Sequence, residues 1–462
     1  MISKLRSRES RAIIGVIIGL AWPTIVEQVM QTAVQYIDTA MVGSLGTQAT
    51  AAVGATSTVG WLIFSTFSAL GVGFLAIIAR ACGAGDKLTA KKAVSQAVFV
   101  VLVTGIISTV VCTAVSGMVP VWMQVDPSIQ KLSATYFFII YLPMLPRAAS
   151  AIFGTVLRAA GDTKTPMKVG VIVNVINITL NFLLIYPTRT ITLFGCGFIM
   201  PGAGMGVIGA AIASAISFVW GGLHITCVLW KHPMVSPSGM SLKPDPGILK
   251  PCIRIAFPNM LQRFGTSLGF VVFAAMINSL GEVATAAHTI ANTVESAFYI
   301  PGYGMQTAAA TLTGNAYGAR DGRRMKSLSA MFIPIEISLM IFSGASLFLA
   351  APALMGIFSS NPDVISLGAT VLRMVAVSEP FYGFSIIVEG MMMGVGKTRK
   401  PFVYNITGMW CVRIVGTFIC TQLLGLGLVS AWACMIAHNM LLFILYLILY
   451  TRGTWNPLNS NA

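Results

Sequence analysis

The chain has 462 residues, of which 56% are hydrophobic and only 9% are charged, and its formal net charge is +15. Soluble domains carry roughly 25% charged residues, so this composition excludes an ordinary water-soluble protein. The apolar residues form long blocks that exceed the ~20 residues a helix needs to cross a bilayer. Because backbone groups in lipid must bond internally, we interpret these blocks as membrane-spanning helices.

Twelve such segments follow one another along the chain. The predicted spans are 13–40, 51–78, 93–116, 134–157, 168–187, 206–230, 249–276, 285–312, 328–351, 367–392, 402–422 and 427–450. The first apolar run continues too far to be the short core of a signal peptide, so we interpret it as a span. The predicted fold class is an all-α integral membrane protein with twelve transmembrane helices.

The basic residues are distributed unevenly over the predicted loops. Most Lys and Arg residues lie in the two tails and in every second loop, whereas the opposite loops hold only Lys131 and Arg189. Basic residues of membrane proteins concentrate on the cytoplasmic side. The pattern therefore predicts that both termini are cytoplasmic, and it explains the net charge without a nucleic-acid partner.

The second half of the chain resembles the first at a constant offset of 235 residues, which relates Ala21 to Ala256. Pro23 then aligns with Pro258, and the tetrapeptide Ala-Thr-Ala-Ala recurs at 49–52 and 284–287. Each half holds six predicted spans, so the halves share one membrane orientation, as in parallel repeats of transporters. We predict an N-terminal six-helix lobe at 1–230, a cytoplasmic linker at 231–251 and a C-terminal six-helix lobe at 252–462.

A polar stripe lies along the first span. Glu27, Gln31, Gln35 and Asp38 are spaced by four, four and three residues and so share one helical face, which we expect to line a hydrated cavity. The counterparts in the second half are Gln262, Thr266, Phe270 and Phe273. The carboxylate of Asp38 is therefore specific to the first half, and a charge within a span indicates a functional site.

Polar side chains in spans 5 and 6 complement this acid. Asn177 and Asn181 share a helical face, and their amides are able to coordinate a cation or bond a carboxylic acid. Ser214 offers a further oxygen. The alternative is that these residues only join helices by hydrogen bonds, which is common in membranes. We predict a cation-coupling site, with Na⁺ as the candidate ion at Asp38.

Acidic residues also lie within spans of the second half. They are Glu295, Glu336, Glu379 and Glu389. Glu295 and Glu379 are the stronger functional candidates, the latter because Pro380 follows it and frees backbone carbonyls. Neutralisation by Arg373 or Arg413 is the alternative interpretation of Glu379.

Three motifs, in this order on a duplicated frame, carry a family resemblance. They are Tyr-Ile-Asp-Thr-Ala-Met-Val-Gly at 36–43, Leu-Arg-Ala-Ala-Gly-Asp-Thr-Lys-Thr-Pro at 157–166, and Glu-Ser-Ala-Phe at 295–298 before Pro-Gly-Tyr-Gly at 301–304. With them the chain resembles the multidrug and toxic compound extrusion (MATE) family over nearly its whole length. The resemblance implies two six-helix lobes around a central cleft.

The resemblance also implies the roles of individual residues. The family's first-span aspartate falls on Asp38, its span 5 asparagine on Asn177 and its span 6 hydroxyl on Ser214. Some members have a second aspartate where this chain has Asn181. Members in which the second lobe couples transport use acids on spans 7, 8 and 10, of which Glu295 and Glu379 match the last two.

The implied function is antiport, in which drug-like and often cationic compounds leave the cell against entry of Na⁺ or H⁺. We expect a monomeric, multi-pass protein of the cytoplasmic membrane that contacts lipid and small molecules and has no cofactor. A flippase for lipid-linked precursors, from the same superfamily, is the alternative transporter. A membrane enzyme or sensor is less favoured, because the chain shows no paired catalytic acids, metal-ligand cluster or attached soluble domain.

Overall fold

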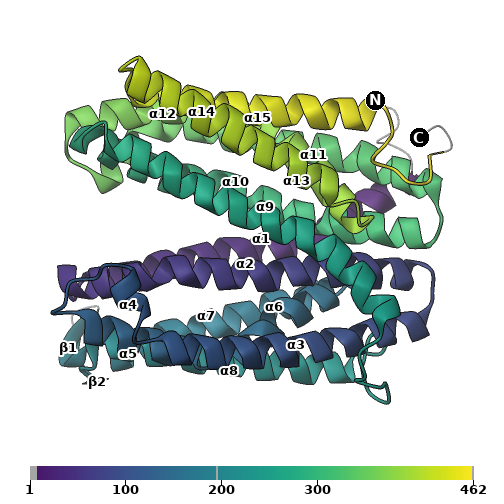
Figure 1. Ribbon diagram of the computed structural model, residues 1–462, viewed down its shortest axis with the longest axis horizontal. Coiled ribbons are helices and arrows are strands. Elements are labelled where there is room, and N and C mark those ends of the chain that lie inside the picture. Colours follow the sequence, from purple (N-terminus) through teal and green to yellow (C-terminus); the bar gives the residue numbers. More distant parts are fainter. Residues whose placement is uncertain (1–7, 194–195, 460–462) are drawn as a thin grey trace. The chain divides into compact units, whose positions relative to one another are not determined.

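A computed structural model describes residues 8–193 and 196–459, and long helices make up most of it (Figure 1). The longer helices of the N-terminal half are α1 (Arg8–Gly43), α2 (Thr47–Gly83), α3 (Lys87–Val115), α5 (Gln130–Tyr141), α6 (Met144–Ala159), α7 (Lys164–Leu184) and α8 (Gly206–Lys231). Those of the C-terminal half are α9 (Pro246–Asn278), α10 (Glu282–Gly318), α11 (Gly322–Phe358), α12 (Pro362–Gly394), α13 (Arg399–Thr407) and α15 (Leu428–Thr451). The short helices are α4 (Val119–Trp122), α14 (Val415–Phe418) and the π-helices η2 (Gly408–Ile414) and η3 (Ile419–Leu423).

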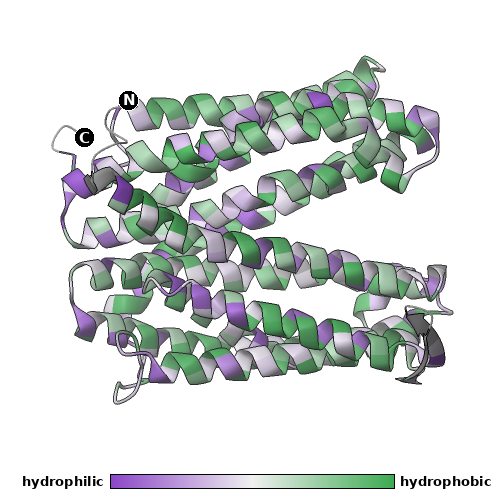
Figure 2. Ribbon diagram, turned by 180° about the vertical axis from the view of Figure 1, so that it is seen from behind, coloured by the Kyte–Doolittle hydropathy of each residue, from purple (hydrophilic) through white to green (hydrophobic). Residues whose placement is uncertain are grey.

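The lengths and compositions of these helices suit a membrane. Ten described segments are long and apolar enough to cross a bilayer, and the bent pair α5 and α6 adds an eleventh. The twelfth predicted span corresponds to α10, which has 37 residues but carries polar groups such as His288 and Glu295. Figure 2 shows hydrophobic residues along most of the helices, with hydrophilic residues mainly near their ends. The expected all-helical membrane architecture is confirmed.

Two local features differ from the predicted spans. The segment predicted as one span at 134–157 is two helices, α5 and α6, which are bent by 49°. Pro143 lies at the break, where a proline lacks the N–H that a continuous helix requires. Between α7 and α8 the strands β1 (Pro187–Leu193) and β2 (Cys196–Ala203) pair as an antiparallel hairpin, which the sequence analysis did not predict.

The described chain forms two compact units. The C-terminal unit contains residues 8–28, 75–86 and 251–459, and the N-terminal unit contains residues 29–74 and 87–250. The start of α1 and the end of α2 therefore pack with the second half of the sequence. The lobe boundaries at 230 and 252 stay a prediction from the sequence.

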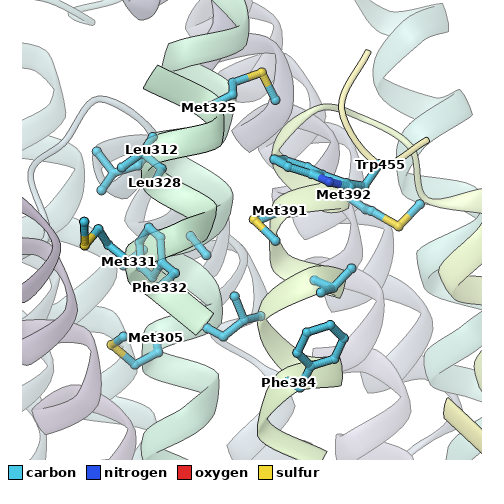
Figure 3. Packing of buried hydrophobic residues seen from close by; sticks show 14 of the residues in the cluster. Met305, Leu312, Met325, Leu328, Met331, Phe332, Phe384, Met391, Met392 and Trp455 are labelled. Carbon is cyan, nitrogen blue, oxygen red and sulfur yellow. The ribbon is translucent and has the colours of Figure 1, made fainter. Parts of the chain in front are cut away.

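The core of the C-terminal unit is rich in methionine. Figure 3 shows these side chains packing against Phe332, Phe384 and Trp455. The buried methionines are Met305, Met325, Met331, Met391 and Met392. Flexible thioethers fill irregular gaps between helices, so this core joins α10, α11 and α12 closely and fixes the acids they carry.

The end of α2 crosses α10 at two glycines of the C-terminal unit. A Cβ atom added to Gly83 would lie 1.9 Å from the carbonyl oxygen of Asn315, and one added to Gly318 would lie 1.9 Å from that of Arg80. The offset of 235 residues relates Arg80 to Asn315 and Gly83 to Gly318. Counterparts of the repeat thus meet each other in reciprocal contacts, as a two-fold axis through the crossing requires.

The predicted linker is bonded to α3. Helix α8 ends at Lys231 and α9 already begins at Pro246, so the irregular part of the linker is 232–245. The buried Gln96 side chain donates to the Lys243 carbonyl at 2.9 Å and accepts from the Asp245 N–H at 2.9 Å. Because one side chain satisfies two backbone groups, this part of the linker has a fixed path over the N-terminal unit.

Candidate functional site

The N-terminal unit holds a polar cluster around Asp38 of α1. Asn181 of α7 donates from its Nδ2 to Asp38 Oδ1 at 2.6 Å. Asp38 is partly buried, whereas Asn181 is 1% exposed. A hydrogen bond to a carboxylate is about twice as strong as a neutral one, so this contact ties α1 to α7.

Asn177 and Ser214 extend the cluster to α8. With the Asn177 amide nitrogen turned toward the acid, this nitrogen lies 2.9 Å from Asp38 Oδ1, and the amide oxygen accepts from Ser214 Oγ at 3.1 Å. This orientation gives the nitrogen an acceptor and the oxygen a donor. The structure therefore brings together all four residues that the sequence predicted for the coupling site.

The cluster offers oxygen atoms to a small cation. Both asparagine amides donate to Oδ1 of Asp38, and Oδ1 of Asn181 is buried without a hydrogen-bond partner in the described chain. Asp38 contributes the only carboxylate of the four residues, and Ser214 adds a hydroxyl. The described residues contain no group of three or more His, Cys, Asp or Glu side chains suited to a metal. The chemistry thus fits a weakly held ion or a proton better than a resident metal.

Tyr136 of α5 lies near the same acid and was not predicted. It is 8% exposed and is within electrostatic range of Asp38. A tyrosine in an apolar helix is usually a packing residue, and the sequence holds no signal that places it here. Only the packing of α5 in the N-terminal unit reveals its position.

The remaining polar residues of α1 differ in burial from the cluster. Gln31 and Gln35 are exposed, and Glu27 is partly exposed. All lie on one continuous helix with Asp38, as the spacing predicted. Their proposed contact with a hydrated cavity stays a prediction.

The C-terminal unit brings three buried acids together. Glu295 of α10, Glu336 of α11 and Glu379 of α12 are 6%, 0% and 2% exposed, and Glu379 is within electrostatic range of both others. The sequence analysis ranked Glu336 below the other two. The structure places all three in one group, which we call the carboxyl cluster.

Two glycines provide the space for Glu336. A Cβ atom added to Gly302 of α10 would lie 2.6 Å from Glu336 Oε1, and one added to Gly383 of α12 would lie 3.4 Å from the same atom. Neither carboxyl oxygen of Glu336 has a hydrogen-bond partner in the described chain. The Pro-Gly-Tyr-Gly motif at 301–304 thus has a packing role.

The two arginines considered as partners of Glu379 lie elsewhere. Arg373 is exposed, and its Nε donates to the Phe348 carbonyl at 3.4 Å. Arg413 of η2 is buried and within electrostatic range of Glu295. The charged neighbours of Glu379 are therefore acids.

Glu389 is bonded differently from the carboxyl cluster. Its Oε1 accepts from Gln262 Nε2 at 2.8 Å, and its Oε2 accepts from Asn405 Nδ2 at 3.4 Å. A buried carboxylate with donors on both oxygens is a stable structural link. This acid joins α9, α12 and α13.

Comparison with known proteins agrees with the duplicated frame. The MatE family model matches residues 23–183 and again 258–419, two segments whose starts differ by the same 235 residues. A probable multidrug resistance protein NorM of Thermotoga maritima is 28% identical over 439 residues, which cover 95% of this chain and 92% of that protein. The probable multidrug resistance protein YoeA of Bacillus subtilis is 24% identical, with 89% and 87% covered.

Solved structures show the same architecture. A crystal structure of a MATE protein in complex with MaD3S superposes with a TM-score of 0.87 at 24% identity, covering 96% of both chains. An outward-facing multidrug resistance MATE transporter of the MOP superfamily gives a TM-score of 0.86 with the same identity and coverage. The fold is therefore that of twelve transmembrane helices in two lobes. The chain belongs to the MATE family, whose members are membrane transporters and not enzymes.

Proposed function

We propose that this chain is a multidrug efflux transporter that exports drug-like, often cationic and amphipathic compounds in exchange for Na⁺ or H⁺. The multidrug resistance proteins to which it is similar support the export. The cluster of Asp38, Asn177, Asn181 and Ser214 supports the exchange, because one carboxylate with two amides and a hydroxyl is able to bind a small cation.

The hydrogen bonds of Asp38 suggest how an ion would act. Asn181 and Asn177 both direct amide nitrogens at its Oδ1. A proton or Na⁺ on this carboxylate competes with those donors, so binding changes the contacts between α1 and α7. A ligand shifts a conformational equilibrium only by its different affinity for two states, and these contacts supply such a difference.

The topology proposal follows from the charge pattern. We propose a monomer in the cytoplasmic membrane with both termini in the cytoplasm, in which six-helix lobes at 1–230 and 252–462 alternate access to the two sides. Glu295 and Glu379 are the proposed second-lobe site, and Glu27, Gln31 and Gln35 are the proposed cavity lining. The exported small molecule and the lipid are the partners of the chain.

Everted membrane vesicles test the coupling role of Asp38. Vesicles loaded with Na⁺ or with acid should accumulate a fluorescent cationic dye, and the effective ion identifies the coupling. Asp38→Asn should reduce this gradient-driven uptake by roughly 5- to 150-fold, the usual range of a coupling free energy. The matched control is Asp363→Asn, since Asp363 is exposed at the start of α12, and its uptake should equal that of the wild type. Normal gradient-driven uptake by Asp38→Asn would exclude this residue from coupling.

A further inference from the structure

Arg413 lies in the C-terminal unit where the repeat predicts the counterpart of the Asp38 site. The counterparts of Gln35 and Asp38 are Phe270 and Phe273 of α9. The Arg413 guanidinium carbon lies 4.8 Å and 4.1 Å from the centroids of these two rings. Helix η2 falls on the counterpart of α7, so an arginine here faces two rings where α7 directs amides at an acid.

The guanidinium is buried and lacks a fixed hydrogen bond at one nitrogen. Arg413 is 4% exposed, and its Nε has no partner in the described chain. Contact with aromatic faces attracts a cation by only about 0.5–2 kcal/mol, which is less than the cost of an isolated charge in a membrane. The residue therefore needs an acid as its counter-charge.

Glu295 is that acid. The titratable groups within electrostatic range of Arg413 come from three packed helices and are Glu295, Tyr299 and His288 of α10, Tyr382 of α12 and His438 of α15. Glu295 is the acid among these groups. The other two members of the carboxyl cluster, Glu336 and Glu379, have no comparable basic neighbour among the interactions that shape Glu379.

Aromatic side chains adjoin these acids. The Tyr299 ring meets the rings of Tyr303 and Tyr382 at centroid distances of 5.9 and 6.1 Å, and the hydroxyl groups of Tyr303 and Tyr382 lie 2.9 Å apart. Tyr299 is within electrostatic range of Glu295 and Glu379. Acids beside tyrosine faces are the groups that recognise an organic cation.

We propose that Arg413 is a tethered cation that competes with an organic cation for Glu295 and so sets the affinity of this site for positively charged substrates. The inference rests on the proposed export of cationic compounds. Without substrate, the guanidinium neutralises Glu295 and is held over Phe270 and Phe273. A cationic substrate that stacks on the tyrosines takes over the carboxylate, and Arg413 keeps its contact with the two rings.

Equilibrium binding to the purified protein tests this without an ion gradient. The probe is a fluorescent monovalent organic cation, and an uncharged dye of similar size is the control ligand. Arg413→Gln should bind the cation roughly tenfold more tightly, since it removes a charged competitor. Arg413→Lys keeps the positive charge and should restore affinity close to that of the wild type. None of these variants should alter the binding of the uncharged dye.

A double-mutant cycle separates competition from a structural role. In the background of Glu295→Gln, the further change Arg413→Gln should have no effect on cation affinity, because the contested carboxylate is gone. Equal affinity of Arg413→Gln and wild type would overturn the proposal, as would a change that persists in the Glu295→Gln background. If Arg413→Gln alone does not fold, the comparison of Arg413→Lys with the doubly neutral variant still decides, because the proposal predicts weaker cation binding by Glu295→Gln than by Arg413→Lys. Failure of this cycle would leave the coupling test at Asp38 unaffected.

Discussion

The repeat places opposite charges at equivalent positions of the two halves. In the first half the carboxylate of Asp38 accepts hydrogen bonds from α7, whose counterpart in the second half includes η2. In the second half the guanidinium of Arg413 lies over the ring of Phe273, the counterpart of Asp38. A site that suits an external cation in one half thus contains an internal cation in the other.

The two halves nevertheless share a backbone frame. The reciprocal contacts of Gly83 with Asn315 and of Gly318 with Arg80 have the same closest distance. Small residues let helices approach closely in membranes, so their positions are constrained by packing. The comparison teaches that duplication kept the crossing of the helices and left the buried charges free to diverge.

The largest effect should come from filling the shared crossing. Gly83→Ala and Gly318→Ala each place a methyl group against a carbonyl oxygen, and such overpacking costs about 1–3 kcal/mol. We expect both variants to lower the thermal unfolding temperature in detergent by similar amounts. Gly19→Ala is the control, since a Cβ atom there meets nothing within 4 Å. A large loss for one glycine and none for the other would show that the crossing is not symmetric.

A smaller effect should follow from removing the amide that bonds the first-half acid. Asn181→Ala deletes a hydrogen bond to a charged group, worth about 1.5–3 kcal/mol. It should shift the ion concentration that half-activates dye uptake by roughly 10- to 150-fold. Asn174→Ala on the same helix, which makes no recorded bond to Asp38, serves as the matched control. An unchanged ion dependence in Asn181→Ala would mean that this amide does not tune the acid.

The smallest shift is expected at Ser214. Ser214→Ala removes a bond between neutral groups, worth about 0.5–1.5 kcal/mol, and should move the half-activating ion concentration by roughly 2- to 12-fold. Ser217 bonds the Ala213 carbonyl of its own helix at 2.7 Å, so Ser217→Ala should not alter the ion dependence. A shift at Ser217 as large as that at Ser214 would contradict a specific role for the Asn177–Ser214 bond.

Much of the fold could be predicted because the membrane restricts the options. Span lengths and the repeat offset follow from hydropathy and identities along the chain. The break at Pro143 was missed because an apolar run hides a bend, and the β1–β2 hairpin because the analysis considered only spans there. The packing of α1 residues 8–28 with the C-terminal unit depends on tertiary contacts, which no local pattern encodes.

The first-half site was easier to predict than the second. Asp38, Asn177 and Asn181 stand out because polar residues are rare in spans and share helical faces. Tyr136 and Glu336 carry no such signal, since their significance depends on neighbours from other helices. Arg413 could be noted in the sequence, but only its distance to Phe273 shows that it lies at the counterpart of Asp38.

The central claim is that an external cation acts through Asp38, whereas Arg413 supplies the internal charge of the second half. Its most direct test titrates the coupling ion against a bound cationic dye on purified protein, with choline chloride as the control for ionic strength when the ion is Na⁺. The account predicts that the ion displaces the dye from wild type and from Arg413→Gln, and that Asp38→Asn binds the dye but does not release it. Displacement from Asp38→Asn at the wild-type ion concentration would contradict the account.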